Sequence, residues 1–245
     1  MTLQISPAAK SELAPSGLLR AGINLGNFLL VTSREANGDP AGIAPDMACA
    51  LAASAGVPVK LLPYPSPGAL SESAGSGVWD VAFLGAEPAR AKEIDFSAAY
   101  VEIDAGYLVP AGSTLKTIDE VDSKGVRIAV SARSAYDLYL TRSLKNAELV
   151  RVEGIDAAYQ HFAKEKLDAL AGLKPGLIAN AETLPGSRVL EGRFTAVQQA
   201  AGVPAGRSLA AAYLKQFIEH AKASGLVASL MEKHGVKELS VAAGV

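Results

Sequence analysis

Short apolar runs alternate along this chain with longer segments whose apolar residues recur at helical spacing. The short runs predict strands at residues 18–25, 57–62, 81–84, 101–109, 126–130, 149–152, 167–170, 188–190 and 194–199. The longer segments predict helices at residues 42–56, 69–76, 118–122, 135–144, 154–164, 177–184, 208–224 and 225–235. Strands that alternate with helices are typical of an α/β fold. Residues 1–16 show neither pattern, and we expect them to form a loose N-terminal arm.

The stretch from residue 79 to 100 carries the clearest candidate chemistry. Its apolar run at 81–84 suits a strand buried on both faces, and Gly85 ends the run where a ligand can approach the backbone. Pro88 marks a turn or the first turn of a helix, and Arg90 follows it. A guanidinium beside exposed backbone N–H groups would bind a carboxylate. The alternative is a surface arginine paired with Asp95.

Four further polar residues lie at expected strand ends or helix starts. Asn24 lies near the carboxyl end of the first expected strand and Asn27 follows that strand, where ligands bind in open α/β sheets, although asparagines also form turns. Tyr64 lies in a proline-rich loop and faces either a ligand or the core. Ser134 precedes the helix at 135–144, where it either grips an anion or serves only as the helix N-cap.

A family resemblance rests on the segment that reads Pro88-x-Arg90-x-Lys92-x-x-Asp95-Phe96-Ser97-x-x-Tyr100. It resembles the signature of the polar amino-acid family of bacterial extracellular solute-binding proteins, and the likeness extends from about residue 17 to 235. The resemblance implies an α/β, two-lobed, type II periplasmic-binding-protein-like fold with two hinge crossings. Lobe 1 would comprise residues 17–104 and 200–245, and lobe 2 residues 105–199.

The resemblance also implies roles for individual residues. Arg90 would hold the ligand carboxylate with help from backbone N–H groups near Gly85 and Ala86. Ser134 would contribute from lobe 2, so that the ligand is enclosed in an interlobe cleft. Asn24, Asn27 and Tyr64 would shape the first-lobe wall.

The chain departs from the family pattern in two places. The Gly-x-Ser/Thr-x-Thr run that usually precedes the arginine is reduced to Leu84-Gly85-Ala86-Glu87, which lacks hydroxyl groups. Glu87 either replaces them or caps a helix. In lobe 2, Leu173 stands where the resemblance places the aspartate that pairs with a ligand ammonium. An unpaired buried ammonium costs several kcal/mol. Either another acid, such as Glu87, Glu102 or Asp104, pairs with the ammonium, or the ligand is a carboxylate without an amino group.

Composition narrows the range of partners. Hydrophobic residues make up 49% of 245, and 23 basic residues nearly balance 25 acidic ones, which disfavours nucleic-acid and anionic-membrane partners. The single cysteine, Cys49, lies in an Ala-rich stretch, and we expect a buried structural thiol. The sequence shows no cofactor motif and no pair of histidines at metal-binding spacing. We expect no catalytic residues, no cofactor and no metal.

These observations predict a monomeric substrate-binding protein that captures a small carboxylate, either an amino acid or an amino-group-free organic acid, with an ABC permease as partner. One alternative is an enzyme similar to cyclohexadienyl or arogenate dehydratases, with Glu87, Glu102 or Asp104 as general acid. Another is a cytosolic ligand sensor on the same fold.

The resemblance implies the periplasm, yet the first residues lack the basic start and long apolar run of a secretory signal. Either a signal has been removed or the protein is cytoplasmic. The initial Met, and the short approach from Pro15 to the first strand, favour the cytoplasmic interpretation.

Overall fold

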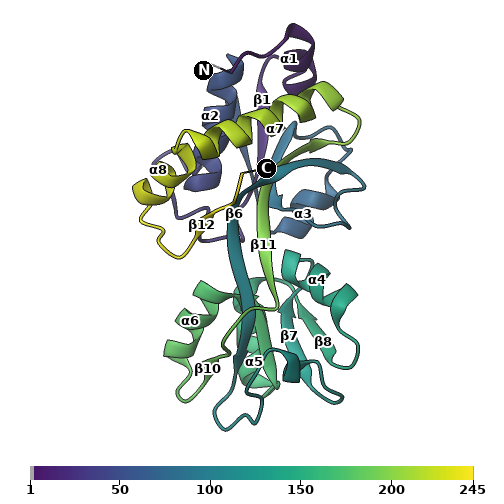
Figure 1. Ribbon diagram of the computed structural model, residues 1–245, viewed down its shortest axis with the longest axis vertical. Coiled ribbons are helices and arrows are strands. Elements are labelled where there is room, and N and C mark those ends of the chain that lie inside the picture. The colour runs from purple at the N-terminus through teal and green to yellow at the C-terminus, as the bar shows by residue number, and fades with distance from the viewer. Residues whose placement is uncertain (1–2, 245) are drawn as a thin grey trace. The chain divides into compact units, whose positions relative to one another are not determined.

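The chain passes twice between two units in the computed structural model, which describes residues 3–244 (Figure 1). Unit 1 contains the described residues up to Glu102 and from Gln198 onward, and unit 2 contains Ile103–Val197. The first passage lies within β6 (Ile94–Val109) and the second within β11 (Thr195–Pro204). The expected passages near residues 104 and 200 fall in the same two strands.

Unit 1 is built on parallel strands. Its other elements are α1 (Pro7–Leu13), β1 (Leu19–Asn24), β2 (Ser33–Arg34), β3 (Pro40–Ala41), α2 (Ile43–Ala55), β4 (Val59–Tyr64), α3 (Pro67–Glu72), β5 (Val81–Gly85), α7 (Ser208–Ala223), α8 (Leu226–Lys233) and β12 (Ser240–Val241). The strand order is β4-β1-β5-β11, with the first three parallel and β11 antiparallel to β5. All five residues of β5 are buried, as its continuous apolar run predicts for a strand covered on both faces.

Helices cover the sheet of unit 1 and pack on one another. The helix α7 contacts α1 and α8, and α8 also contacts α2 (Figure 1). Beneath α3, a core cluster joins Leu70, Trp79, Ala82, Leu84 and Ile94. The β11 strand crosses β6 closely at Gly202, where a Cβ atom would lie 2.4 Å from Ile94. Because β4, β1 and β5 are parallel neighbours, their carboxyl ends lie at one edge of the sheet.

Unit 2 repeats the parallel arrangement on a smaller scale. Its elements besides parts of β6 and β11 are η1 (Asp119–Val121), β7 (Arg127–Ser131), α4 (Ala135–Ser143), β8 (Glu148–Val152), α5 (Ile155–Lys164), β9 (Ala169–Leu173), α6 (Lys174–Thr183) and β10 (Arg188–Val189). The strand order is β6-β9-β7-β8, with β7, β8 and β9 parallel and β9 antiparallel to β6. The core packs Phe162, Leu167, Leu170 and Leu177 together.

Two local expectations differ from the structure, and a third had two alternatives. Residues 7–13 form helix α1, with Ser6 as N-cap and Pro7 at its first turn, so this part of the chain is not a loose arm. Residues 88–93 form turns and then enter β6, so of the two alternatives for Pro88 the turn is confirmed. Cys49 is exposed on α2, so the prediction of a buried thiol was wrong. The Ala-rich pattern gave the helix correctly, but it did not show which face is covered.

Candidate functional site

The carboxyl ends of three parallel strands meet at one edge of unit 1. Asn24, the last residue of β1, pairs in register with Tyr64, the last residue of β4. Gly85 ends the neighbouring strand β5, and Arg90 lies in the turns that follow it. This edge is where open α/β sheets bind ligands, and unit 1 therefore brings four of the predicted residues to one sheet edge.

Arg90 is a buried arginine, with 5% of its surface exposed. Its Nη1 donates to the Gly85 carbonyl oxygen at 2.5 Å, which ties the guanidinium to the end of β5. Burial lowers the pKa of Arg90 to about 10, and the nearby charge of Glu87 opposes that shift. The guanidinium therefore stays charged at neutral pH in a desolvated setting, where its attraction to an anion is stronger than in water. The surface-arginine alternative does not describe this side chain.

The backbone around Gly85 is arranged differently from the expectation. The N–H of Ala86 donates to the Gln198 carbonyl oxygen of β11 at 2.7 Å. It is therefore part of the sheet hydrogen bonding, and the prediction that Ala86 offers its N–H to a ligand is not supported in this conformation. Gly85 contributes its carbonyl oxygen to Arg90 instead. The main-chain carbonyl group at this position thus helps to place the arginine.

The two asparagines stabilise turns. Asn24 is 8% exposed, and its Oδ1 accepts from the Gly26 N–H at 3.0 Å. Asn27 is 4% exposed, and its Oδ1 accepts from the Leu29 N–H at 3.2 Å. Both side-chain oxygens therefore have local partners, as the turn-forming alternative predicts. Their amide NH₂ groups are the parts with which a ligand acceptor could interact.

Tyr64 packs against the core cluster of unit 1 and is partly buried. This contact matches the packing alternative for Tyr64. The structure also shows an aromatic residue that the sequence interpretation missed. Phe28, directly after Asn27, is 45% exposed. The sequence showed an aromatic residue four positions after the end of β1, but it did not show that this side chain is exposed.

The candidate acids lie in different settings. Glu87 is 8% exposed and acts electrostatically on Arg90. Asp104, in the unit 2 part of β6, pairs with Arg193 at 2.6 Å. Glu102 is partly buried in β6, opposite Ser240 of β12. Glu87 is the one of these three that the structure brings beside Arg90.

The corresponding edge of unit 2 carries Ser134. It is the N-cap of α4, and its Oγ accepts from the Asp137 N–H at 3.1 Å, so the predicted capping role is confirmed. The Tyr136 hydroxyl hydrogen-bonds with Ser134 and Ser131, and burial raises the pKa of Tyr136 to about 12. Ser134 itself is 5% exposed. Leu173 ends the parallel strand β9 at the same edge, so an apolar residue stands where the resemblance places an acid.

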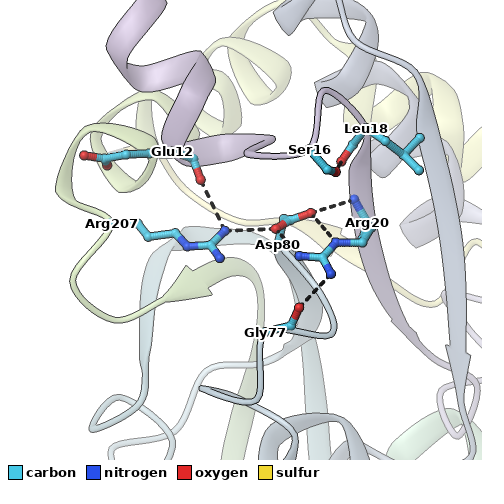
Figure 2. A network of polar contacts seen from close by, with 7 residues as sticks. All are labelled: Glu12, Ser16, Leu18, Arg20, Gly77, Asp80 and Arg207. Atoms are coloured by element: carbon cyan, nitrogen blue, oxygen red, sulfur yellow. Dashed lines mark hydrogen bonds and ion pairs between the residues drawn. The ribbon is translucent and has the colours of Figure 1, made fainter.

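A second buried polar cluster of unit 1 lies around Asp80, which is fully buried (Figure 2). Its carboxylate accepts from the main-chain N–H, Nε and Nη2 of Arg20 at 3.1, 2.9 and 2.8 Å, and from Nη1 of Arg207 at 3.0 Å. Burial alone would raise the pKa of Asp80, but the hydrogen bonds from Arg20 and Arg207 lower it below its usual value. Arg207 also donates to the Glu12 carbonyl oxygen. This closed network serves stability.

Across residues 3–244, no group of three or more His, Cys, Asp or Glu side chains is placed to hold a metal ion. In the same part of the chain, every helix is too short or too polar to cross a membrane.

Comparison with solved structures defines the fold. A mutant of ArgBP from T. maritima matches with TM-score 0.74 at 20% identity, covering 94% of this chain and 100% of that one. An amino acid ABC transporter substrate-binding protein from Streptococcus pneumoniae, bound to L-arginine, matches with TM-score 0.73 at 20% identity, covering 96% and 99%. The ancestral amino acid-binding protein AncCDT-1, a precursor of cyclohexadienyl dehydratase, matches with TM-score 0.72 at 22% identity, covering 91% and 98%. The chain therefore has the type II periplasmic-binding-protein fold.

The family follows from the sequence itself. Residues 22–237 match the bacterial extracellular solute-binding proteins, family 3, and the chain belongs to that family. Comparison with the curated proteins found no match.

Proposed function

We propose that this chain is the substrate-binding component of an ABC importer and captures a small carboxylate ligand. Membership of the solute-binding family supports the transport role. Solved structures of the same fold include proteins bound to arginine, glutamine and lysine, all of which carry a carboxylate. The family description, which names extracellular solute-binding proteins, supports a periplasmic location and delivery to a permease.

The observation that carries the proposal is the setting of Arg90. A charged, desolvated guanidinium lies after the carboxyl end of β5, beside the ends of β1 and β4. A guanidinium has five donors, so its bond to Gly85 does not prevent it from holding a carboxylate. In the proposed complex Arg90 binds the ligand carboxylate from unit 1. Ser134 and the first N–H groups of α4 bind the ligand from unit 2.

The proposed ligand does not depend on an amino group. Leu173 supplies no charge for an ammonium. Glu87 in unit 1 lies three residues before the arginine, is buried and interacts with it electrostatically. An amino acid would bind if Glu87 paired with its ammonium. An amino-group-free organic acid would leave Glu87 with Arg90. Both kinds of carboxylate belong in the test.

A thermal-shift panel tests the proposal. The full chain is heated with matched pairs of acids that differ only in the amino group, together with the corresponding amines without a carboxylate. At 100 times Kd, a ligand that binds only the folded state stabilises it by about 2.7 kcal/mol. In a chain of this size the midpoint should rise by about 5–10 °C. Stabilisation by an amine alone, or by no member of a broad carboxylate panel, would contradict the proposal.

A second candidate function is a dehydratase, favoured by the likeness to a precursor of cyclohexadienyl dehydratase. Of the three acids considered, Glu87 is best placed as general acid because it is buried beside Arg90, whereas Asp104 is engaged by Arg193. The chain is incubated with prephenate or arogenate while the absorbance of an aromatic product is followed. Turnover that disappears in Glu87→Gln supports the enzyme. Binding without turnover supports the transporter role.

A further inference from the structure

The turn between β7 and α4 holds a side-chain-bearing residue in an unusual backbone conformation. Arg133 has φ +58°, and Lys166 is the other non-glycine residue with positive φ in the described chain. This left-handed region is costly for a residue with a Cβ atom and persists only when its surroundings enforce it. Arg133 directly precedes Ser134, the N-cap of α4. Something in unit 2 must therefore hold this turn.

The Asp137 carboxylate is the side-chain group that bonds to the Arg133 backbone in this turn. Asp137 is 3% exposed, and its Oδ2 accepts from the backbone N–H of Arg133 at 2.8 Å. Its Oδ1 accepts from Nε of Arg151 on β8 at 2.9 Å. Arg151 also donates from Nη2 to Thr141 Oγ1 at 2.8 Å. The carboxylate is thus fixed by a neighbouring strand and in turn fixes the backbone of the turn.

The same acid is linked to the N-cap. The Asp137 N–H donates to Ser134 Oγ, so the main chain of Asp137 is coupled to the side chain of Ser134. The N–H groups of Ala135 and Tyr136, in the first turn of α4, point along the helix axis away from its body. Their direction depends on how the preceding turn is held. A change at Asp137 would therefore reorient these N–H groups without touching a ligand.

We propose that Asp137 is a positioning residue for anion recognition: held by Arg151, it keeps Arg133 left-handed and so aims Ser134 and the first N–H groups of α4 at a bound carboxylate. This inference rests on the proposed function, in which that helix end contacts the ligand. Asp137 itself does not touch the ligand. The side chain of Arg133, which pairs with exposed Glu153 at 2.8 Å, has no part in the claim.

A double-mutant cycle separates positioning from plain stability. Asp137→Ala is measured in two backgrounds, the wild-type chain and Arg133→Gly, with the strongest-binding carboxylate of the thermal-shift panel. Glycine adopts positive φ without strain, so it removes the need for the holding contact. We expect Asp137→Ala to raise Kd about 10-fold or more in the wild-type background and less than about 3-fold in the glycine background. If Asp137 only stabilised the fold, its removal would raise Kd by the same factor in both backgrounds.

Controls make the cycle decisive. Asp156→Ala removes an exposed acid from the first turn of α5 in the same unit and should leave Kd unchanged. All titrations are run well below the unfolding midpoint of the least stable variant. Equal losses in the two backgrounds, or no loss in either, would overturn the inference.

The outcome also distinguishes the inference from the proposed function. If the wild-type chain binds none of the carboxylates, the proposed function fails. The positioning claim is then read from hydrogen exchange at the amides of Ser134, Ala135 and Tyr136. Exchange should change in Asp137→Ala and return toward wild type when Arg133→Gly is added. Identical exchange in all chains would refute the holding role.

Discussion

Two buried charged residues of unit 1 have different surroundings. Asp80 is fully buried, and four hydrogen bonds from Arg20 and Arg207 surround its carboxylate. Arg90 is nearly as buried; its Nη1 donates to the Gly85 carbonyl oxygen, and Glu87 acts on it electrostatically. Asp80 directly precedes β5, whereas Arg90 follows the carboxyl end of that strand, where open α/β sheets bind ligands. We therefore assign stability to the first residue and propose ligand capture for the second.

Removal of the Asp80 carboxylate should destabilise the fold strongly. In Asp80→Ala, two arginines lose their shared partner while they remain partly buried, at 28% and 23% side-chain exposure. We expect the free energy of unfolding to fall by about 3 kcal/mol or more, the scale of breaking a buried ion pair. Denaturant unfolding measures the change. Glu165→Ala, which removes an acid from an exposed 3.8 Å pair with Lys164, should cost less than about 1 kcal/mol.

A second variant, Asp80→Asn, shows through its pH dependence whether the charge of Asp80 causes the stabilisation. The folded-state pKa of Asp80 is lowered, so its charge stabilises the fold above the unfolded-state value of about 3.9. That contribution is lost as pH falls through the folded-state pKa. The difference in stability between the wild-type chain and Asp80→Asn should therefore be constant from pH 5 to 7 and shrink below about pH 4. A difference that does not change with pH would show that packing, not charge, is responsible.

At the residue scale, the sequence showed which residues are candidates for a role better than it showed which residues they interact with. Arg90 could be selected from the sequence because its motif is local, with a strand end, a turn and a guanidinium within a few residues. The role of Asp80 could not be predicted from the sequence, because its partners Arg20 and Arg207 lie 60 and 127 residues away along the chain. The local bonds of Asn24 and Asn27 span two residues, and the sequence interpretation anticipated them as an alternative.

At the scale of elements, α7 begins without a side-chain cap of its own. Its N-cap position is Arg207, and the carboxylate of Glu12 in α1 supplies the cap from a distant part of the chain. Glu12 Oε2 accepts from the N–H groups of Leu209 and Ala210 at 2.8 and 3.0 Å. A carboxylate at this end also complements the helix dipole. The helix α1 is therefore an integral part of unit 1.

Glu12→Ala should lower the free energy of unfolding by about 1 kcal/mol, the usual cost of losing an N-cap. Glu12→Gln keeps an acceptor oxygen and should recover part of that loss. The unfolding midpoint in denaturant provides the measurement, with exposed Glu232→Ala in α8 as the matched control. If all three variants unfold alike, α1 does not cap α7 in solution.

The helix α1 also shows where sequence interpretation failed for elements. Ser6 and Pro7 are good helix-start signals, but seven residues are too few for a helix that lacks tertiary support. That support comes from α7, which the sequence does not place beside it. The start of β6 was missed for a similar reason. Its first residues, from Ile94, carry mixed polar and apolar side chains, and pairing with β11 rather than periodicity makes them a strand.

At the scale of the whole molecule, the chain crosses twice between units, and each unit presents the carboxyl ends of its parallel strands. The order of strands and helices predicted the α/β class, and the segment around Arg90 predicted the family to which the chain belongs. The ligand could not be predicted. In the proposed complex it depends on a few side chains at strand ends. Two of those, Glu87 and Leu173, stand where the family resemblance leads us to expect other residues.

The central claim is that Arg90 binds a ligand carboxylate, and calorimetric titration of Arg90→Ala tests it most directly. Lys92→Ala, which removes an exposed cation two residues away, is the matched control. Circular dichroism establishes that each variant is folded before titration. We predict that Arg90→Ala weakens binding by about 2 kcal/mol or more, or roughly 30-fold in Kd, while Lys92→Ala binds like the wild-type chain. Wild-type affinity in a folded Arg90→Ala chain would contradict the account.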